Sequence, residues 1–207
     1  MKITIIGSGN MGSGLAKQFI KAGQQVFICS RDQEQAQEVA KQTGAQVLPD
    51  NNSGPNADVI VIATAYTDAV GALQQLGNLN GKTVIDITNP LTSDYMGLTL
   101  GHTTSAAEEI ARAFPSAHVI KAFNTVFAQI LQEGPDLGAG QIVPVFYAGD
   151  NEEAKNQVRG LIESTGFKPV DAGPLKNARY LEPVAGLNIY FGYGAGLGTA
   201  IAPNWIP

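Results

Sequence analysis

The sequence predicts a doubly wound α/β fold with a mainly parallel sheet and a C-terminal helical tail. Two near-continuous runs of β-branched residues, 58–64 and 82–88, are typical of strands buried on both faces of a parallel sheet. Segments with helical patterns separate the apolar runs along the chain. Strands that alternate with helices indicate right-handed crossovers, and they place a ligand at the carboxyl edge of the sheet.

Predicted strands and helices alternate along most of the chain, and this alternation ends at the C-terminal tail. A helix is expected over 177–190, interrupted by Pro183 and Gly186, and the glycine- and aromatic-rich segment 191–198 is either its continuation or a loop. A polar turn is expected over 50–56. Strands are expected at 2–6, 25–29, 45–48, 58–64, 82–88, 118–123, 143–148 and 167–171, and further helices after Gly12 and at 33–43, 66–76, 105–114 and 152–164.

Length and composition favour one large domain, residues 1–175, with a helical tail, residues 176–207, that packs on it or on a partner in a homodimer. The net charge of −5 argues against a nucleic-acid partner. Without an apolar run of membrane-spanning length or a leader, we expect a cytoplasmic protein with no membrane partner. Cys29 stands alone and His102 and His118 lack ligand spacing, so we expect neither a disulfide nor a metal site.

The first strand runs into Gly7-Ser8-Gly9-Asn10-Met11-Gly12, a complete G-x-G-x-x-G followed by an amphipathic helix. Glycine is needed at Gly7 for the tight turn, at Gly9 for the approach of a pyrophosphate, and at Gly12 for close packing of helix and strand. The phosphates then lie at a helix N-terminus, where free N–H groups favour anions. The motif predicts a dinucleotide-binding Rossmann fold.

The second strand ends in Ser30-Arg31, where an NAD-binding protein places an acidic residue for the ribose hydroxyls. A guanidinium pairs with a 2′-phosphate, which a carboxylate would repel. The sequence therefore predicts NADP(H), with Arg31 as the main determinant and Ser30 as a second donor. Asp32 is interpreted as the N-cap of the next helix. The alternative for Arg31 is a solvated surface charge.

Four segments together resemble a known family: residues 7–12, Ser30-Arg31, residues 119–125 (VIKAFNT) and residues 171–175 (DAGPL). They are similar to the deazaflavin (coenzyme F420)-dependent NADP oxidoreductases. The stretch from Lys121 to Asn124 also resembles the NADPH domain of the six-transmembrane metalloreductases. The resemblance implies hydride transfer between NADP(H) and a small flavin-like or deazaflavin acceptor.

The resemblance also implies a set of cofactor-binding residues. The chain departs from the deazaflavin enzymes at Asn124, where they carry a histidine, and at Asn89-Pro90, where they carry a more variable, aromatic-rich turn, so the identity of the acceptor stays open. By position, Gly7, Ser8, Gly9, Asn10 and Met11 would hold the pyrophosphate, and Ser30 and Arg31 would hold the 2′-phosphate. Thr64, Ala65 and Tyr66 would border the ribose and diphosphate. The residues that would flank the nicotinamide are Thr88, Asn89, Pro90, Leu91, Ala122, Phe123, Asn124 and Thr125.

The sequence assigns no catalytic residue. Ring-to-ring hydride transfer needs alignment more than a proton donor. Lys121 is either a general acid or a structural lysine paired with a carboxylate, for which Asp86 is a candidate. Two alternatives to a flavin-like reductase stay open. One is an imine or β-hydroxyacid reductase, against which the short tail counts, and the other is a non-enzymatic NADPH sensor.

Overall fold

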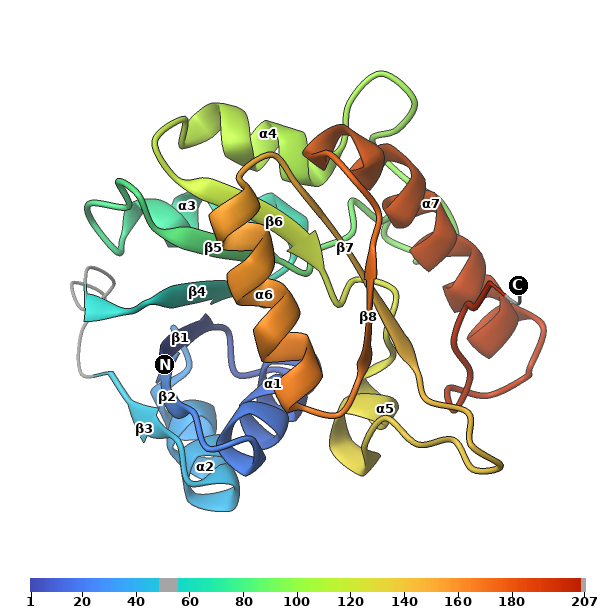
Figure 1. Ribbon diagram of the computed structural model, residues 1–207, viewed down its shortest axis with the longest axis horizontal. Coiled ribbons are helices and arrows are strands. Elements are labelled where there is room, and N and C mark those ends of the chain that lie inside the picture. The colour runs from blue at the N-terminus through green and yellow to red at the C-terminus, as the bar shows by residue number, and fades with distance from the viewer. Residues whose placement is uncertain (49–55, 206–207) are drawn as a thin grey trace.

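A computed structural model describes residues 1–48 and 56–205. Its eight strands form one sheet in the order β3-β2-β1-β4-β5-β6-β7-β8 (Figure 1). Neighbouring strands are parallel except for β6 and β7. The predicted doubly wound, mainly parallel sheet is confirmed. The strands are β1 (Lys2–Ile6), β2 (Gln25–Cys29), β3 (Gln46–Val47), β4 (Val59–Ile62), β5 (Thr83–Asp86), β6 (His118–Ala122), β7 (Pro144–Gly149) and β8 (Lys168–Asp171).

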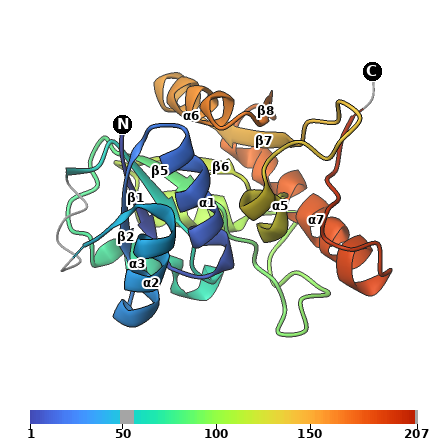
Figure 2. The same cartoon turned by 90° about the horizontal axis from the view of Figure 1, so that it is seen from below.

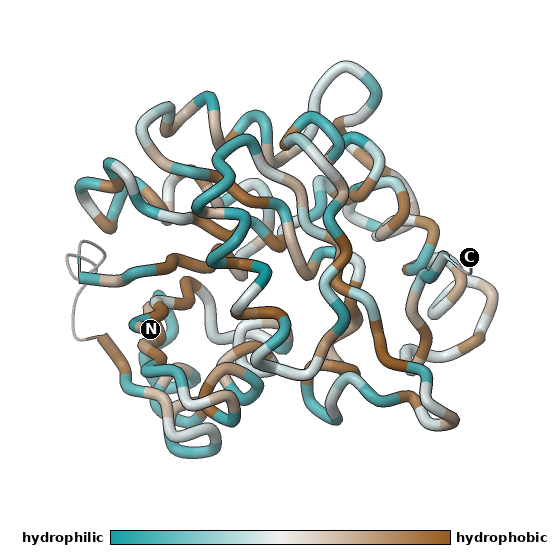
Figure 3. The backbone as a smooth tube through the Cα atoms, viewed as in Figure 1, coloured by the Kyte–Doolittle hydropathy of each residue, from teal (hydrophilic) through white to brown (hydrophobic). Residues whose placement is uncertain are grey.

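Helices cover both faces of the sheet (Figure 2). One buried cluster joins the sheet to α1, α2, α5 and α6, and a second joins it to α3, α4 and the start of α7. The central strands between them are apolar on both faces, and Figure 3 shows β4 brown along most of its length. The helices are α1 (Asn10–Lys21), α2 (Gln33–Thr43), α3 (Tyr66–Gln74), α4 (Ala106–Ala113), α5 (Ala128–Glu133), α6 (Glu152–Ser164) and α7 (Ala178–Ile189).

Side-chain caps fix where several helices begin. The Asp32 carboxylate accepts a hydrogen bond of 2.9 Å from the Gln35 N–H at the start of α2, which confirms its predicted capping role. Ser105 and Asn151 cap α4 and α6 in the same way. The turn predicted over 50–56 lies, apart from Asn56, outside the described residues.

The reversal of direction at β7 was not predicted. The chain between β6 and β7 contains only α5, which has six residues. At about 1.5 Å of rise per residue, such a helix is too short to return the chain to the other end of the sheet. It packs across α1 instead, where the Gln18 side chain donates to the Leu131 carbonyl over 2.6 Å. The chain therefore enters β7 antiparallel to β6 and adds β8 parallel to β7.

The C-terminal segment packs on the body of this chain. Leu181 contacts the outer strands β7 and β8 through a small apolar cluster, and Trp205 stacks edge-on against Phe146 with ring centroids 5.3 Å apart. Pro183 lies inside α7 without breaking it, although it removes one backbone hydrogen bond. A π-helical turn, Tyr190–Gly194, extends the helix before the loop that follows. The domain boundary at 175/176 stays a prediction.

No helix within the described residues is long and apolar enough to span a bilayer.

Candidate functional site

The glycine-rich turn after β1 lies at the carboxyl edge of the sheet, beside the ends of the neighbouring strands β2 and β4. Gly7 has a φ of +112°, and a Cβ there would lie 2.5 Å from the Ala63 carbonyl oxygen. A Cβ on Gly12 would overlap the carbonyl oxygen of Gly7. A Cβ on Gly9, by contrast, would meet no atom within 4 Å. Gly7 and Gly12 therefore allow close packing, whereas Gly9 borders open space.

The N-terminus of α1 has the features of an anion site. Its N-cap is Gly9, no side chain caps it, and its first turn holds no acidic residue. The N–H groups of this turn and the positive end of the helix dipole are consequently available to an anion. Together with the space beside Gly9, these features fit a dinucleotide pyrophosphate.

Ser30 and Arg31 follow β2, next to this turn. The Ser30 hydroxyl lies 2.9 Å from the Ser8 hydroxyl. Arg31 donates to the Asp68 carboxylate of α3 over 2.7 Å, and its side chain is 81% exposed. The guanidinium is thus held by an acidic residue that sequence reasoning missed, while most of it is accessible to a further anion. Its recognition of a 2′-phosphate stays a prediction.

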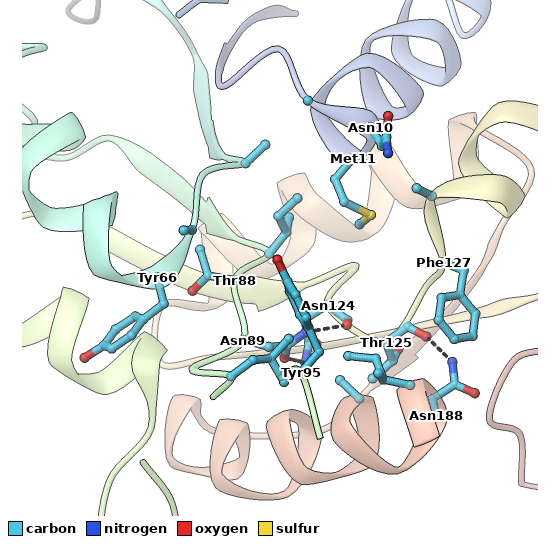
Figure 4. Close-up of a pocket in the computed structure, with 18 of the residues that line it drawn as sticks. Asn10, Met11, Tyr66, Thr88, Asn89, Tyr95, Asn124, Thr125, Phe127 and Asn188 are labelled. Atoms are coloured by element: carbon cyan, nitrogen blue, oxygen red, sulfur yellow. Dashed lines mark hydrogen bonds between the residues drawn. The ribbon is translucent and has the colours of Figure 1, made fainter. Parts of the chain in front are cut away.

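A pocket of about 900 Å³ extends from the glycine-rich turn along the carboxyl edge (Figure 4). It contains the predicted residues Gly9, Asn10, Met11, Thr64, Ala65, Tyr66, Thr88, Asn89, Leu91, Asn124 and Thr125. Gly7, Ser8, Ser30, Arg31 and Pro90 are not part of its lining. At the far end, which we call the acceptor end, the lining residues are Leu91–Met96, Val126–Ala128, Ala185, Asn188, Ile189 and Tyr193.

Two asparagine side chains form the floor of the pocket. The Asn124 Nδ2 group donates to Asn89 Oδ1 over 2.9 Å and to the Leu181 carbonyl over 3.0 Å. Asn89 Nδ2 in turn donates to the Asn124 carbonyl over 2.9 Å. Because two acceptors face Asn124 Nδ2, the orientation of this amide is determined by the network. The pair joins the loops after β5 and β6 and links both to α7.

The floor also has unused hydrogen-bonding capacity. Within the described part of the chain, the buried side-chain oxygens without a hydrogen-bond partner are Thr88 Oγ1, Asn124 Oδ1 and Thr125 Oγ1. All three belong to residues that line the pocket. Buried polar atoms are normally paired, and leaving one unpaired costs about 1–3 kcal/mol. These three oxygens have almost no exposed surface, so they make the floor polar without themselves being open to a ligand.

The predicted nicotinamide-flanking residues Ala122 and Phe123 lie below the floor and do not line the pocket. Phe123 is 1% exposed, and its ring packs edge-on against Phe19 and Phe167 at centroid distances of 6.0 and 6.2 Å. Its φ of +60° turns the chain so that Asn124 reaches the pocket. Their side chains therefore belong to the core, because the strand end is buried between the sheet and its helices.

Aromatic side chains line both ends of the pocket. Tyr66 begins α3, and Phe127 and Tyr193 pack edge-on with ring centroids 5.8 Å apart. Tyr95 lies on the loop after β5 and is 63% exposed. Of these four, sequence reasoning named only Tyr66 as a site residue. For Tyr193 the signal was the glycine- and aromatic-rich segment, whereas Tyr95 and Phe127 lie in irregular loops without a periodic pattern.

Lys121 is buried beneath the floor and does not line the pocket. Its Nζ lies 2.7 Å from Asp86 Oδ2, 2.8 Å from Glu182 Oε1 and 2.7 Å from the Thr88 carbonyl oxygen. Burial alone would lower the pKa of Lys121, but the charges of Asp86 and Glu182 outweigh this effect and raise it. The predicted Lys121–Asp86 pair is confirmed, and Glu182 is a second, unpredicted partner.

Lys121, Asp86 and Glu182 form a buried charged cluster, and Glu182 connects it to α4. Its carboxylate accepts hydrogen bonds from the N–H groups of Ala106 (2.9 Å) and Ala107 (3.3 Å), at the helix N-terminus. A negative charge is favourable at that end of the helix dipole. The cluster therefore fastens α7 to α4 and to the ends of β5 and β6, directly under the pocket.

Few ionisable groups line the pocket. Among the described residues that line it, none is Lys, Arg, His, Cys or Glu. Burial raises the pKa of Tyr66, and the negative charge of Glu109 adds to this effect, so its phenol stays protonated at neutral pH. The described residues contain no group of three or more His, Cys, Asp and Glu side chains that could hold a metal ion.

Comparison with known proteins places this site in a family context. A family model described as "NADP oxidoreductase coenzyme F420-dependent" matches residues 2–90. The chain is 30% identical to the F420-dependent NADP reductase of Methanothermobacter marburgensis, over 91% of this chain and 91% of that protein. It is similar in structure to a "putative F420 dependent NADP-reductase" from Arthrobacter sp. FB24, with a TM-score of 0.90, 29% identity and complete coverage of both chains.

Metalloreductases are similar over a shorter part of their length. The chain is 33% identical to metalloreductase STEAP3 of Rattus norvegicus over 88% of this chain, but it spans only 36% of that protein.

Proposed function

This chain belongs to the family of coenzyme F420-dependent NADP oxidoreductases, and from that premise we propose that it transfers a hydride between NADP(H) and a flat, conjugated, flavin-like acceptor. The observation that carries the proposal is the pocket itself. It joins a glycine-rich anion site at one end to aromatic side chains at the other, and a polar floor lies between them. Aromatic side chains of this kind stack against flat rings.

The proposed cofactor position rests on the following residues. Gly9 and the N-terminus of α1 would hold the pyrophosphate, and Ser30 and Arg31 would contact the 2′-phosphate. Thr64, Ala65 and Tyr66 would border the ribose and diphosphate, and Asn89 and Asn124 would flank the nicotinamide. NADP(H) bound there would supply or accept the hydride.

The residues of this chain then act through alignment. The Asn89–Asn124 pair and the buried Lys121 cluster hold the floor under the nicotinamide, while Tyr95, Phe127 and Tyr193 shape the place for the second ring. Holding two reactants in register accelerates a transfer without a proton donor. The described residues of the lining include no Lys, Arg, His, Cys or Glu, so a proton donor for the reduction of a carbonyl or imine would have to be Asp94 or one of the tyrosines Tyr66, Tyr95 and Tyr193.

Steady-state oxidation of NADPH tests this proposal. NADPH oxidation is measured with a panel of candidate acceptors that contains flavins, a deazaflavin, quinones, a β-keto acid and cyclic imines. We expect turnover with the flat ring acceptors and little with the keto acid or the imines. Turnover confined to the imines or the keto acid would favour the alternative reductases, and NADPH binding without turnover on any acceptor would favour a sensor.

Cofactor preference provides a second test. We expect NADPH to bind at least about tenfold tighter than NADH, because a charge-assisted hydrogen bond from Arg31 to the 2′-phosphate contributes roughly 1.5–3 kcal/mol. Arg31→Ala removes most of this preference in a titration by calorimetry. Asp68→Asn is the matched control, since it breaks the same ion pair but keeps the guanidinium, and the preference should persist. Equal affinities of the unmodified protein for both cofactors would refute the assignment.

We also propose that the protein forms a homodimer through its C-terminal segment. Several large apolar side chains of this segment are exposed, namely Tyr180, Leu187, Tyr190, Phe191, Leu197 and Trp205. Clustered exposed apolar residues mark association surfaces. Light scattering coupled to size-exclusion chromatography measures the oligomeric state, and a monomer at micromolar concentration contradicts the proposal.

A further inference from the structure

The acceptor end of the pocket lacks positive charge. Among the described residues that form it, none is Lys, Arg or His, and its one charged side chain is Asp94. An adjoining hollow of about 290 Å³ shares Asn188 with the pocket and is otherwise lined by the uncharged residues Val184, Leu187, Phe191, Leu197, Ile201, Ala202 and Pro203. The two ends of the site therefore differ in their capacity to bind anions, since the proposed cofactor end has the N-terminus of α1 and Arg31 to bind phosphate groups.

Asp94 keeps its negative charge. Its carboxylate accepts hydrogen bonds from the Thr92 hydroxyl (2.5 Å) and from the Met96 N–H (3.1 Å). These hydrogen bonds hold the pKa of Asp94 below its ordinary value. The side chain stays on the loop that carries Tyr95 and contributes a fixed negative charge next to the acceptor.

Three cations on neighbouring elements are engaged elsewhere. Arg179, the cation of α7, forms hydrogen bonds of 2.8 and 2.7 Å with the two carboxylate oxygens of Glu108. Lys121 of β6 is buried between Asp86 and Glu182. Lys17 of α1 donates to the Gln132 carbonyl over 2.7 Å. A phosphate or carboxylate at the acceptor end would gain no cationic partner from these residues, and it would lie near the negative charge of Asp94.

We infer that the acceptor of this protein is an uncharged conjugated ring, a neutral flavin or quinone without an anionic substituent. The inference rests on the proposed function and narrows its substrate class. The apolar side chains of the acceptor end, among them Leu91, Met96 and Ile189, suit such a ring. A flavin or deazaflavin that carries phosphate or carboxylate groups is accordingly a poorer substrate than its uncharged counterpart.

Riboflavin and FMN test the inference, because they share one ring and differ by a phosphate. NADPH oxidation is measured at low ionic strength with each flavin. We expect kcat/KM for riboflavin to exceed that for FMN by about tenfold or more, mainly through KM, and the ratio to shrink as salt screens the charges. Flavin fluorescence gives the dissociation constants of both flavins from the NADP⁺-saturated protein, and these should show the same order without turnover.

Asp94→Asn identifies the source of the discrimination. The amide oxygen of asparagine still accepts the hydrogen bonds from Thr92 and Met96, so the loop is kept while the charge is removed. We expect the riboflavin-to-FMN ratio to fall in this variant and to stay unchanged in Glu153→Gln, which removes the same charge from the exposed first turn of α6.

Three outcomes decide between the two proposals. Preference for riboflavin that weakens in Asp94→Asn supports the inference. Equal use of both flavins, or preference for FMN, overturns it and leaves the proposed hydride transfer intact. No turnover and no binding of riboflavin, FMN or menadione, in a protein that binds NADPH, contradicts the proposed function itself.

Discussion

Lys121→Met is expected to destabilise the protein by roughly 3–5 kcal/mol, the range typical of removing one partner from a buried ion pair. The substitution removes the one positive charge between Asp86 and Glu182 while roughly keeping the volume of the side chain. It also deprives the Thr88 carbonyl oxygen of its donor. Urea unfolding measures the loss, and NADPH affinity should change only indirectly, because Lys121 does not line the pocket.

The pH dependence of this loss reports its cause. The charges of Asp86 and Glu182 raise the pKa of Lys121 in the folded protein, so the contribution of its charge to stability is present at neutral pH and is lost as the pH rises through the folded pKa. The deficit of the variant relative to the unmodified protein should therefore be constant near neutral pH and shrink at strongly alkaline pH.

A second substitution separates the structural role from a catalytic one. Lys121→Met combined with Glu182→Gln removes one of the two stranded charges, and we expect it to regain part of the lost stability, since groups in one network are not additive. A stable Lys121→Met protein that binds NADPH normally but turns over slowly would contradict the structural role. It would indicate a proton donor and favour carbonyl or imine reduction.

Gly9→Val is expected to weaken NADPH binding about a hundredfold or more, or roughly 3 kcal/mol, while the fold persists. The Gly9 backbone has a φ of −70°, which valine adopts without strain, and a Cβ there meets no atom within 4 Å. The added side chain instead projects into the space proposed for the pyrophosphate. The cost to stability should stay near that of a poorer N-cap, about 1 kcal/mol. Titration calorimetry and urea unfolding measure the two effects.

Gly12→Ala serves as the contrasting variant. Its Cβ would overlap the Gly7 carbonyl oxygen, so helix α1 has to move away from β1, and stability should fall markedly along with binding. If Gly9→Val unfolds the protein as Gly12→Ala does, Gly9 is needed for folding. If Gly9→Val binds NADPH as tightly as the unmodified protein, the proposed position of the pyrophosphate is wrong.

Local patterns in the sequence were enough to predict the architecture of the N-terminal part. The turn after β1, the buried strands β4 and β5 and the Asp32 cap depend on residues close together along the chain, and all were found where expected. Their signals are periodicity, turn chemistry and capping, which act over a few residues. The family resemblance, resting on four short segments, was confirmed as well.

The interior of the site was less predictable. Phe123 is the last residue of a predicted strand and precedes Asn124, yet its ring lies in the core and only Asn124 reaches the pocket. A φ of +60° on a phenylalanine decides this, and no sequence pattern indicates it. Tyr95 and Phe127 line the pocket from irregular loops, whose course depends on what they pack against.

The sequence by itself determined the dinucleotide-binding turn, the mainly parallel sheet and the edge at which the site lies, because these follow from short-range periodicity and from the geometry of glycine. Only the tertiary structure decided that Glu182 joins Lys121 and Asp86, that β7 runs antiparallel to β6, and that the described residues of the acceptor end include no cation. These features arise where elements far apart in the chain meet. Their contacts are selected by packing and by the pairing of buried charges, which no local pattern records.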